Sequence, residues 1–278
     1  MPGASSAGCR ARSFAAVSRK IEALLSDRRA RDRDGLFFVE GVRNFVQAVD
    51  NGFSVERILF SDRLLTSAIA RKLVRQSRRS GVPTNKLTPE AFRKFSQAKR
   101  ASGVAAVLRQ RWARLEDVTP DHGLCWIAVG AVRSPGNLGT LIRSSQAVGG
   151  AGIFCAGDGV DPYAPAVVRS AMGSLFRQSF VRTTWPEIQR WAAAHGCPVI
   201  GASPDGATEM HRFAFPSAPL LLLGEERKGL DAQQRSLCGT LVRIPMQTGT
   251  DSLNLGVAGS LLMYEVLRCR NRTGRSGV

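Results

Sequence analysis

The stretch that decides the fold is Ile244-Pro245-Met246-Gln247-Thr248-Gly249-Thr250-Asp251-Ser252-Leu253-Asn254-Leu255-Gly256-Val257-Ala258-Gly259. It follows the apolar pair Leu241-Val242, which is typical of a strand, and leads into an apolar helical pattern that runs to Val266. Regular strand pairing is expected to end at Pro245, because proline has no N–H to donate. Ser252 and Asn254 stand where the helix is expected to begin. They therefore either cap its free N–H groups or face a ligand.

Two earlier stretches have the same form. The first, Arg133-Ser134-Pro135-Gly136-Asn137-Leu138-Gly139-Thr140-Leu141-Ile142-Arg143-Ser144, follows an apolar run at 125–129 and opens a helix. The second is the fully apolar strand at 220–223, which ends in the charged loop Gly224-Glu225-Glu226-Arg227-Lys228-Gly229. The carboxyl ends of parallel strands meet at one edge of a sheet, where ligands bind. The three stretches therefore predict a single site.

Together, the three stretches resemble the signature motifs of the SpoU (TrmH-like) RNA ribose 2′-O-methyltransferases of the SPOUT class. The motifs occur in order as Asn-x-Gly-x-x-x-Arg (Asn137 to Arg143), Gly-x-Glu-x-x-Gly (Gly224 to Gly229) and Ile-Pro-Met…Ser-Leu-Asn (Ile244 to Asn254). The resemblance covers residues 123–268, and more weakly the chain before them. One departure is Gly256, where the family usually has Ser. This change is expected to loosen the start of the helix.

The resemblance implies an α/β protein with two parts. The C-terminal part would be a mostly parallel sheet with a trefoil knot, and a small N-terminal α/β domain would bind the RNA substrate. Knots are rare, so the knot follows from the resemblance and not from the sequence pattern. The resemblance also implies S-adenosylmethionine as the cofactor and a homodimer that completes the site across its interface. The long apolar last helix is consistent with a homodimer.

The pattern of apolar residues divides the chain into four segments. We expect a basic N-terminal extension with a helix at 1–33, an RNA substrate-binding domain at 34–110, a linker at 111–122 and a methyltransferase domain at 123–278. Helices are expected at 12–33, 41–49, 64–79, 138–148, 164–172, 185–195, 231–237 and 254–267, and from 89 onward. Strands are expected at 35–39, 55–60, 104–108, 124–132, 152–155, 176–181, 198–201, 219–223 and 240–244, with a short extended stretch at 82–84. Phe38 to Gly41 and Ser102-Gly103 also match the family, with either a structural or an RNA-contacting role.

Charge is concentrated in the first part of the chain. The formal net charge is +17 over 278 residues. Residues 1–114 hold 24 Lys and Arg against 9 Asp and Glu, whereas residues 115–278 hold 15 against 13. A polyanionic partner accounts for such asymmetry, because each neutralised phosphate releases a counterion. RNA is therefore the expected partner, with large-subunit rRNA favoured over tRNA. The alternative is a solvated basic surface.

The remaining composition indicates a globular protein in a reducing compartment. The six cysteines are far apart and without Cys-x-x-Cys pairs, which fits neither a zinc site nor a disulfide framework. The three histidines also lack metal-ligand spacing, so no metal is expected. No apolar run reaches the length of a membrane span. The first twenty residues are basic, as in a transit peptide or, as we prefer, a flexible tail of a cytoplasmic protein.

The family motifs assign roles to particular residues. The expected cofactor pocket has apolar walls and strand-end backbone, supplied by Ala202, Leu223, Gly224, Ile244, Met246 and Leu253. The expected catalytic set is Arg143, Asn137, Glu226, Ser252 and Asn254. An arginine is almost never neutral, so Arg143 is expected to clamp a phosphate and stabilise a developing alkoxide instead of removing a proton. The others would order the loops or position the nucleotide. Each also has a simpler role, as a helix cap or a solvated surface group.

Two alternative functions remain open. A Rossmann-type nucleotide-binding enzyme is suggested by the strand at 124–132, the glycines Gly136 and Gly139, and a later Asp158, although the turn is not Gly-x-Gly-x-x-Gly. A non-catalytic RNA-binding protein on the same fold is the other, and the intact motif residues argue against it.

Overall fold

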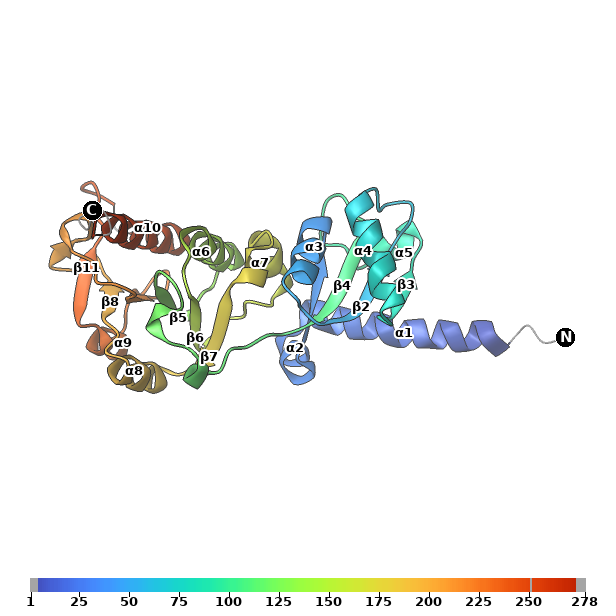
Figure 1. The fold of residues 1–278 in the computed structure, drawn as a ribbon, viewed down its shortest axis with the longest axis horizontal. Coiled ribbons are helices and arrows are strands. Elements are labelled where there is room, and N and C mark those ends of the chain that lie inside the picture. Colours follow the sequence, from blue (N-terminus) through green and yellow to red (C-terminus); the bar gives the residue numbers. More distant parts are fainter. Residues whose placement is uncertain (1–4, 251, 274–278) are drawn as a thin grey trace. The chain divides into compact units, whose positions relative to one another are not determined.

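In the computed structural model, residues 5–250 and 252–273 are described. Residues 1–4 of the predicted basic extension, and residues 251 and 274–278 of the predicted methyltransferase domain, lie outside them. The chain divides into two compact units (Figure 1). The N-terminal unit runs to Gln110 and includes Tyr163–Arg169. The second unit contains Arg111–Pro162 and the chain from Ser170 onward.

The N-terminal unit alternates helices and strands. Its elements are α1 (Ser5–Ser26), α2 (Arg28–Asp34), β1 (Leu36–Glu40), α3 (Val42–Asp50), β2 (Val55–Phe60), α4 (Ala68–Arg79), β3 (Thr84–Lys86), α5 (Pro89–Arg93) and β4 (Val104–Arg109). Among the described residues, the sheet has the strand order β1-β4-β2-β3. Strand β4 is antiparallel to both β1 and β2, and β3 is parallel to β2. One core of this unit packs α1 and α5 against the sheet through Ile21, Leu24, Phe38, Leu59, Phe92 and Val107.

Helix caps explain where the predicted helices were wrong. The single helix expected at 12–33 is interrupted at Asp27, whose carboxylate accepts a hydrogen bond from the Arg29 N–H at 2.8 Å and so begins α2. The helix expected from residue 64 begins at Ala68, because the Ser67 hydroxyl accepts a hydrogen bond from the Ala70 N–H. Short polar side chains at these positions satisfy N–H groups that have no partner inside the helix.

The family-like residues of this unit have structural contacts. The Glu40 carboxylate accepts hydrogen bonds from the Ser96 hydroxyl at 2.6 Å and the Gln97 N–H at 3.0 Å. Gly103 has a φ of +77°, and a Cβ there would lie 2.3 Å from the Leu65 nitrogen. Glycine is therefore required at that position for the close approach of two backbones.

The second unit is built on a parallel sheet. Its strands are β5 (Trp126–Ala131), β6 (Gly152–Gly159), β7 (Ser179–Thr183), β8 (Val199–Ala202), β9 (Thr208–Glu209), β10 (Leu220–Leu223) and β11 (Thr240–Arg243). Its helices are α6 (Pro135–Val148), α8 (Trp185–Ala194), α9 (Ala232–Leu237) and α10 (Leu255–Thr273); α7 (Pro165–Ser170) belongs, except for its last residue, to the N-terminal unit. Among the described residues, the strand order is β7-β6-β5-β10-β8-β11-β9, with every pairing parallel. The central strand β10 is buried throughout, which explains its unbroken leucines.

Two features of this sheet differ from the expectation. The extended stretch expected at 176–181 begins with a 3₁₀ turn, Ser174–Arg177, and the strand starts only at Ser179. The turn buries Leu175 and Phe176, and Phe176 had been expected to begin the extended stretch. The two-residue edge strand β9 was not expected, because so short a segment has no periodicity to detect.

The stretch expected to be a linker packs against the second unit. The Ala113 N–H donates to the Phe180 carbonyl at 2.8 Å. The indole N–H groups of Trp126 and Trp191 donate to the carbonyls of Thr119 and Val118, each at 2.9 Å. Aromatic side chains of the core therefore fix this stretch to the sheet.

Helices α6 and α10 pack against each other (Figure 1), and small residues at their contact allow a close approach. A Cβ at Gly256 would lie 2.9 Å from the Thr140 Cβ, and the hydroxyls of Ser144 and Ser260 are 2.6 Å apart. Gly256 therefore permits the close packing of the two helices. The expectation that glycine loosens this helix start is not supported by these contacts.

Candidate functional site

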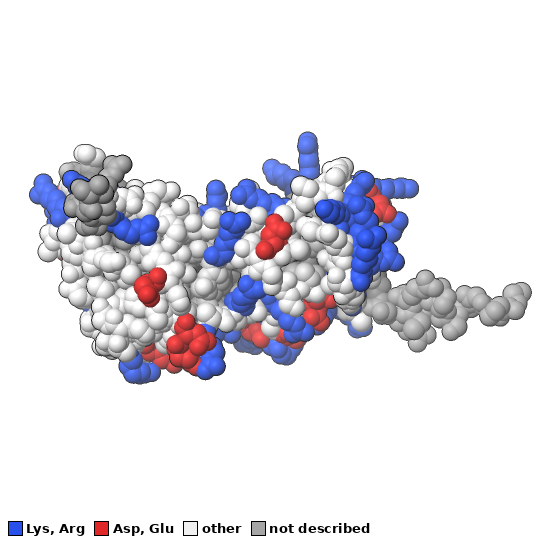
Figure 2. All heavy atoms as spheres, viewed as in Figure 1, with Lys and Arg blue, Asp and Glu red and all other residues white. Residues whose placement is uncertain are grey.

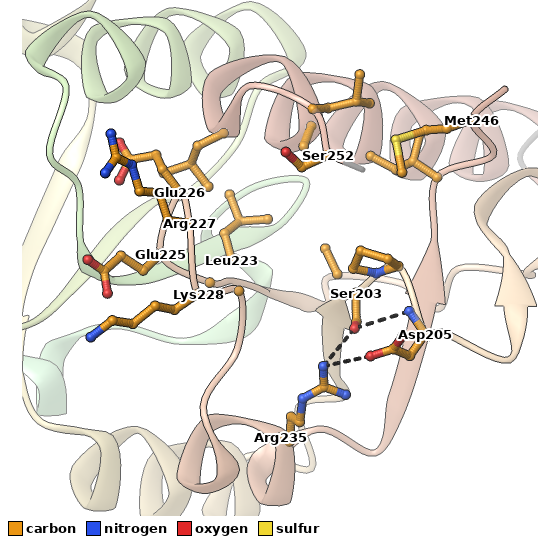
Figure 3. Close-up of a pocket in the computed structure, with 18 residues that line it drawn as sticks. Ser203, Asp205, Leu223, Glu225, Glu226, Arg227, Lys228, Arg235, Met246 and Ser252 are labelled. Carbon is orange, nitrogen blue, oxygen red and sulfur yellow. Dashed lines mark hydrogen bonds and ion pairs between the residues drawn. The ribbon is translucent and has the colours of Figure 1, made fainter. Parts of the chain in front are cut away.

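The segments that follow three neighbouring strands, β8, β10 and β11, line one cavity. Strands β5, β10, β8 and β11 are adjacent and parallel, so their carboxyl ends meet at one edge. A cavity of about 300 Å³ lies at this edge (Figure 3). Its size is at the lower end of the range for small-molecule sites, about 300–1,000 Å³.

All six residues predicted to bind the cofactor line this cavity. Ala202 ends β8, Leu223 ends β10 and Gly224 follows it, and the loop after β11 supplies the others: Ile244, Met246 and Leu253. The walls combine four aliphatic or thioether side chains with the backbone of a tight loop. This combination suits a ligand with both an apolar and a hydrogen-bonding part.

The loop from Gly224 to Gly229 is tight enough to require its glycines. The backbone groups of Glu225 and Gly229 exchange two hydrogen bonds of 3.0 and 2.9 Å. A Cβ at Gly224 would lie 2.2 Å from the Gly229 carbonyl carbon, and Gly229 itself has a φ of +65°. The two glycines of Gly-x-Glu-x-x-Gly therefore allow the backbone to close into a tight loop, and the four residues between them carry the side chains of that loop.

The Glu226 carboxylate connects this loop to the start of α6. It accepts hydrogen bonds from the N–H groups of Arg133 and Ser134 at 3.1 and 3.2 Å and from the Asn137 side-chain amide at 3.2 Å. Ser134, the N-cap of α6, makes no side-chain cap of its own. A carboxylate at the start of a helix is also favoured by the helix dipole.

These hydrogen bonds set the ionisation of Glu226. Burial raises the pKa of its carboxyl, but the N–H groups of Arg133 and Ser134 and the Asn137 amide outweigh burial. The net pKa therefore lies below the ordinary value of 4.5. Glu226 is ionised at neutral pH, as an acceptor of several N–H groups should be.

Asn254 extends the same network to the third motif. Its side-chain amide donates to the Asn137 side-chain oxygen at 2.8 Å. Its own side-chain oxygen accepts from the N–H groups of Gly256 and Val257 at 3.0 and 3.3 Å, so Asn254 caps α10. The chain of contacts from Glu226 through Asn137 to Asn254 thus joins all three predicted motifs.

The other two predicted catalytic residues stand apart from this network. Ser252 is exposed and lines the cavity. Arg143 is exposed on α6 and does not line the cavity. It lies six residues after Asn137, about 9 Å along the helix axis. Its side chain forms no hydrogen bond or ion pair with residues 5–250 and 252–273. The structure therefore does not bring Arg143 into contact with the other members of its predicted set.

Several residues at the site were not predicted. Arg133 forms an ion pair with Glu225, with 2.5 Å between its Nη2 and the carboxylate Oε1. At the cavity wall the Arg235 guanidinium donates to the Ser203 hydroxyl at 3.0 Å and to the Asp205 carboxylate at 3.1 Å (Figure 3). These contacts fix α9 to the loop after β8. They join residues about 30 to 90 positions apart, and no local sequence pattern announces them.

Three buried or partly buried thiols in this unit are not reactive groups. Burial raises the pKa of Cys125 to about 12 and those of Cys197 and Cys238 to about 11. A thiol with such a pKa is protonated at neutral pH and is a poor nucleophile. In the part of the chain that the structure describes, no three His, Cys, Asp or Glu side chains gather as metal ligands. None of the described helices is long and apolar enough to cross a bilayer.

A parallel sheet with a ligand-sized cavity at its carboxyl edge, lined by loops that one polar network connects, is the arrangement in which open α/β proteins bind their ligands. The chain belongs to the SpoU rRNA Methylase family, whose sequence profile matches residues 125–264. Residues 19–106 match a second profile, the MRM3-like substrate binding domain. The family predicted from the three motifs is therefore confirmed.

Known proteins are similar along nearly the whole chain. A 23S rRNA (uridine(2479)-2′-O)-methyltransferase of Streptomyces viridochromogenes is 34% identical over 256 residues, covering 90% of this chain and 88% of its own. The AdoMet-bound rRNA methyltransferase of Sinorhizobium meliloti has a TM-score of 0.83 at 27% identity, covering 91% of this chain and 94% of its own. The SpoU methyltransferase AviRb of Streptomyces viridochromogenes, in complex with AdoMet, has a TM-score of 0.82 at 32% identity, covering 91% and 98%.

Proposed function

We propose that the protein methylates a ribose 2′-hydroxyl in structured RNA, using S-adenosylmethionine, and that its substrate is large-subunit ribosomal RNA. The observation that carries this proposal is the network from Glu226 through Asn137 to Asn254, which joins the three motifs beside a cavity that the second and third of them line. The names of the relatives support the same activity: the 34% identical protein is a 23S rRNA 2′-O-methyltransferase.

The residues at the cavity fit S-adenosylmethionine. Leu223, Ile244, Met246 and Leu253 offer apolar walls to an adenosyl group, and the backbone of Ala202 and Gly224 offers donors and acceptors beside them. When bound there, S-adenosylmethionine supplies an electrophilic methyl group. Two similar structures were solved with AdoMet bound, which supports the same ligand here.

Five residues serve catalysis in this proposal. Asn137, Glu226 and Asn254 are positioning residues, since each binds another motif loop. Ser252, exposed at the cavity, positions the target nucleotide. Arg143 presents a planar guanidinium with several N–H donors. It therefore clamps a phosphate and stabilises the negative charge that develops on the ribose oxygen.

Recognition of RNA is assigned to the N-terminal part of the chain. We expect residues 34–110, with the basic segment 1–33, to bind RNA, residues 111–122 to join the parts, and residues 123–278 to carry methyl transfer. The charge asymmetry and the substrate-binding profile over residues 19–106 support this division. Transfer RNA is the alternative substrate.

The active form is proposed to be a homodimer in the cytoplasm. Val257, Leu261 and Tyr264 stand at helical spacing on α10 with 45, 39 and 53% of their surface exposed. A second subunit would cover this apolar stripe. It would also explain why Arg143 lies away from the cavity of its own chain, since the site would be completed across the interface. Light scattering should give about twice 30.0 kDa, and an active monomer would contradict the homodimer. The trefoil knot stays a prediction.

The decisive experiment measures transfer of a labelled methyl group to RNA. Unmodified 23S rRNA and a tRNA pool are incubated with the protein and labelled S-adenosylmethionine, and 2′-O-methyl positions are mapped. We expect one methylated ribose in 23S rRNA. Calorimetry with S-adenosylmethionine and NAD provides the second arm. Binding of NAD alone, without methyl transfer, would favour the Rossmann-type alternative, and RNA binding without either ligand would favour a non-catalytic protein.

A further inference from the structure

We propose that a basic groove on the N-terminal unit binds the sugar-phosphate backbone of the RNA, an inference that rests on the proposed function. The α4 groove, as we name it, is a hollow of about 380 Å³ whose polar rim is formed by Arg71, Arg75, Arg78, Lys86 and Asp62. Lys86 and Asp62 form an ion pair with each other at 2.5 Å, and the three arginines have no carboxylate partner among the described residues. A second hollow, of about 620 Å³, shares Asp62 and Lys86 and adds Arg63 and Glu90, so its charges balance and the basic surface is confined to the α4 groove.

The sequence of α4 concentrates this charge. Its twelve residues contain five Lys or Arg and no Asp or Glu. Arg71, Arg75 and Arg78 are spaced four and three residues apart, so they share one face of the helix and span about 10 Å along its axis. Figure 2 shows Lys and Arg side chains gathered over the part of the N-terminal unit where Figure 1 draws α4 and β3.

The charges of the groove are largely uncompensated. Arg75 and Arg78 are exposed, and their side chains form no hydrogen bond or ion pair with residues 5–250 and 252–273. Other arginines do pair with a carboxylate, as Arg109 does with Glu56 in this unit and Arg243 with Glu209 in the second. Like charges at this spacing on a helix repel one another. A bound anion would relieve that repulsion.

One arginine of the groove is held in place. The Arg71 guanidinium donates from Nε to the Leu65 carbonyl at 2.7 Å and from one Nη to the Asp62 carbonyl at 3.2 Å. These bonds limit the rotamers of Arg71. A preorganised guanidinium loses less entropy when it binds a phosphate than a freely rotating one does.

The chemistry of the groove favours phosphates over bases. Its cations are guanidinium and ammonium groups, which bind phosphate oxygens, and its floor includes the buried side chains of Leu65 and Val74. The only aromatic residue lining the described groove is Phe60, which is itself half-buried. The described groove therefore offers no exposed aromatic ring on which the bases of a single strand could stack. Contacts to phosphates fix the register of a protein on RNA without reading its sequence.

The test compares a variant that lacks the two unpaired arginines of the groove with a control variant that lacks two cations elsewhere on the same helix. The variant Arg75→Gln/Arg78→Gln loses two cations from the groove. The control Lys72→Gln/Arg79→Gln loses two exposed cations from the same helix, neither of which lines the groove. Affinity of the full chain for an unmodified 23S rRNA transcript is measured by filter binding over a range of salt concentrations. The KM and kcat of methyl transfer and the affinity for S-adenosylmethionine are measured with both variants.

We expect the groove variant to bind the transcript about tenfold more weakly, with a salt slope shallower by about 1.5, as for two lost phosphate contacts. Its KM for RNA should rise by a similar factor, whereas kcat and affinity for S-adenosylmethionine should not change. The control should change affinity less than threefold. Equal effects of the two variants, or parental affinity of the groove variant, would overturn the proposal. Binding of poly-L-glutamate to the parent and to the groove variant is measured as well. If the groove variant loses affinity for poly-L-glutamate but keeps its affinity for RNA, the partner of the groove is an acidic protein and the proposal is overturned.

The groove and the proposed function fail in different ways. A parent protein that binds RNA through the groove but transfers no methyl group would contradict the enzymatic function alone. Methyl transfer with parental KM in the groove variant would contradict the groove alone.

Discussion

The side-chain amide of Asn254 donates a 2.8 Å hydrogen bond to the side-chain oxygen of Asn137, 117 residues earlier in the chain. Each asparagine has a second role: Asn137 donates to Glu226, and Asn254 caps α10. Asparagine suits both positions, because its side chain donates and accepts at once.

Replacing Asn254 should separate these roles. Asn254→Ala loses the cap and the bond to Asn137, and should lower the free energy of unfolding by about 1–2 kcal/mol together with cofactor affinity. Asn254→Asp keeps an oxygen that can cap α10 but has no N–H for Asn137. It should therefore retain more stability than Asn254→Ala while still losing cofactor affinity. Denaturant unfolding and calorimetry check both, and a double-mutant cycle with Asn137→Ala should be non-additive. If the changes in the free energy of unfolding were additive, the hydrogen bond between Asn254 and Asn137 would contribute no coupling energy.

The Glu226 carboxylate should make stability depend on pH. Its folded pKa lies below 4.5, so its contribution is fully present above that value and is lost as pH falls through the folded pKa. Glu226→Gln should lower the free energy of unfolding at pH 7 by about 1–3 kcal/mol. The gap between parent and variant should narrow as pH falls below 4.5 and through the lower folded pKa, where the parent carboxyl becomes protonated. A gap that stays constant between pH 7 and pH 3 would show that ionisation of Glu226 is not involved.

Arg143→Ala should affect catalysis and not the fold. Loss of a preorganised donor to developing charge typically reduces rate about a hundred- to a thousand-fold. The melting temperature and cofactor affinity should stay near the parent values, since the described structure gives this exposed side chain no partner. Arg143→Lys should rescue poorly, because an ammonium lacks the planar fork. Arg190→Ala, another exposed arginine in the same unit, is the control. Methyl transfer by Arg143→Ala within a few-fold of the parent would reject the assigned role.

Gly256→Ala tests the packing of α10 on α6. The added Cβ would lie 2.9 Å from the Thr140 Cβ, a backbone-proximal atom that cannot rotate away. Such overpacking typically costs about 1–3 kcal/mol. The control Gly239→Ala has its nearest neighbour at 3.8 Å and should change the melting temperature little. Because alanine favours a helix over glycine by about 1 kcal/mol, net stabilisation by Gly256→Ala would show that the contact is easily relieved.

A chain that begins at Arg111 should separate the two proposed activities. It keeps Val118 and Thr119, whose carbonyls accept hydrogen bonds from the indoles of Trp191 and Trp126. It should therefore fold and bind S-adenosylmethionine, but should lose most RNA affinity with the basic residues before it. A chain that begins at residue 123 lacks both carbonyls and should be less stable. RNA affinity and salt slope equal to those of the full chain would contradict the charge argument.

The sequence predicted the family, the α/β fold and the methyltransferase class, and all three are confirmed. Strand ends such as Leu223 and Ala202 were predictable, because neighbouring parallel strands must end at the same edge. Contacts between distant polar groups were not. Arg133 with Glu225 and Arg235 with Ser203 depend on side-chain geometry that only the assembled sheet creates. The functional roles of the predicted residues, including Arg143, stay predictions.

The network that joins Glu226, Asn137 and Asn254 has a consequence for biosynthesis. A ribosome makes Asn137 long before Asn254, so a nascent chain holds the first motif without its last hydrogen-bonding partner. Contacts between residues so far apart form late, after the intervening chain has been ordered. The cofactor pocket would therefore mature only when α10 docks against α6. Until then an incomplete chain would lack a closed pocket and could not transfer a methyl group to the wrong RNA.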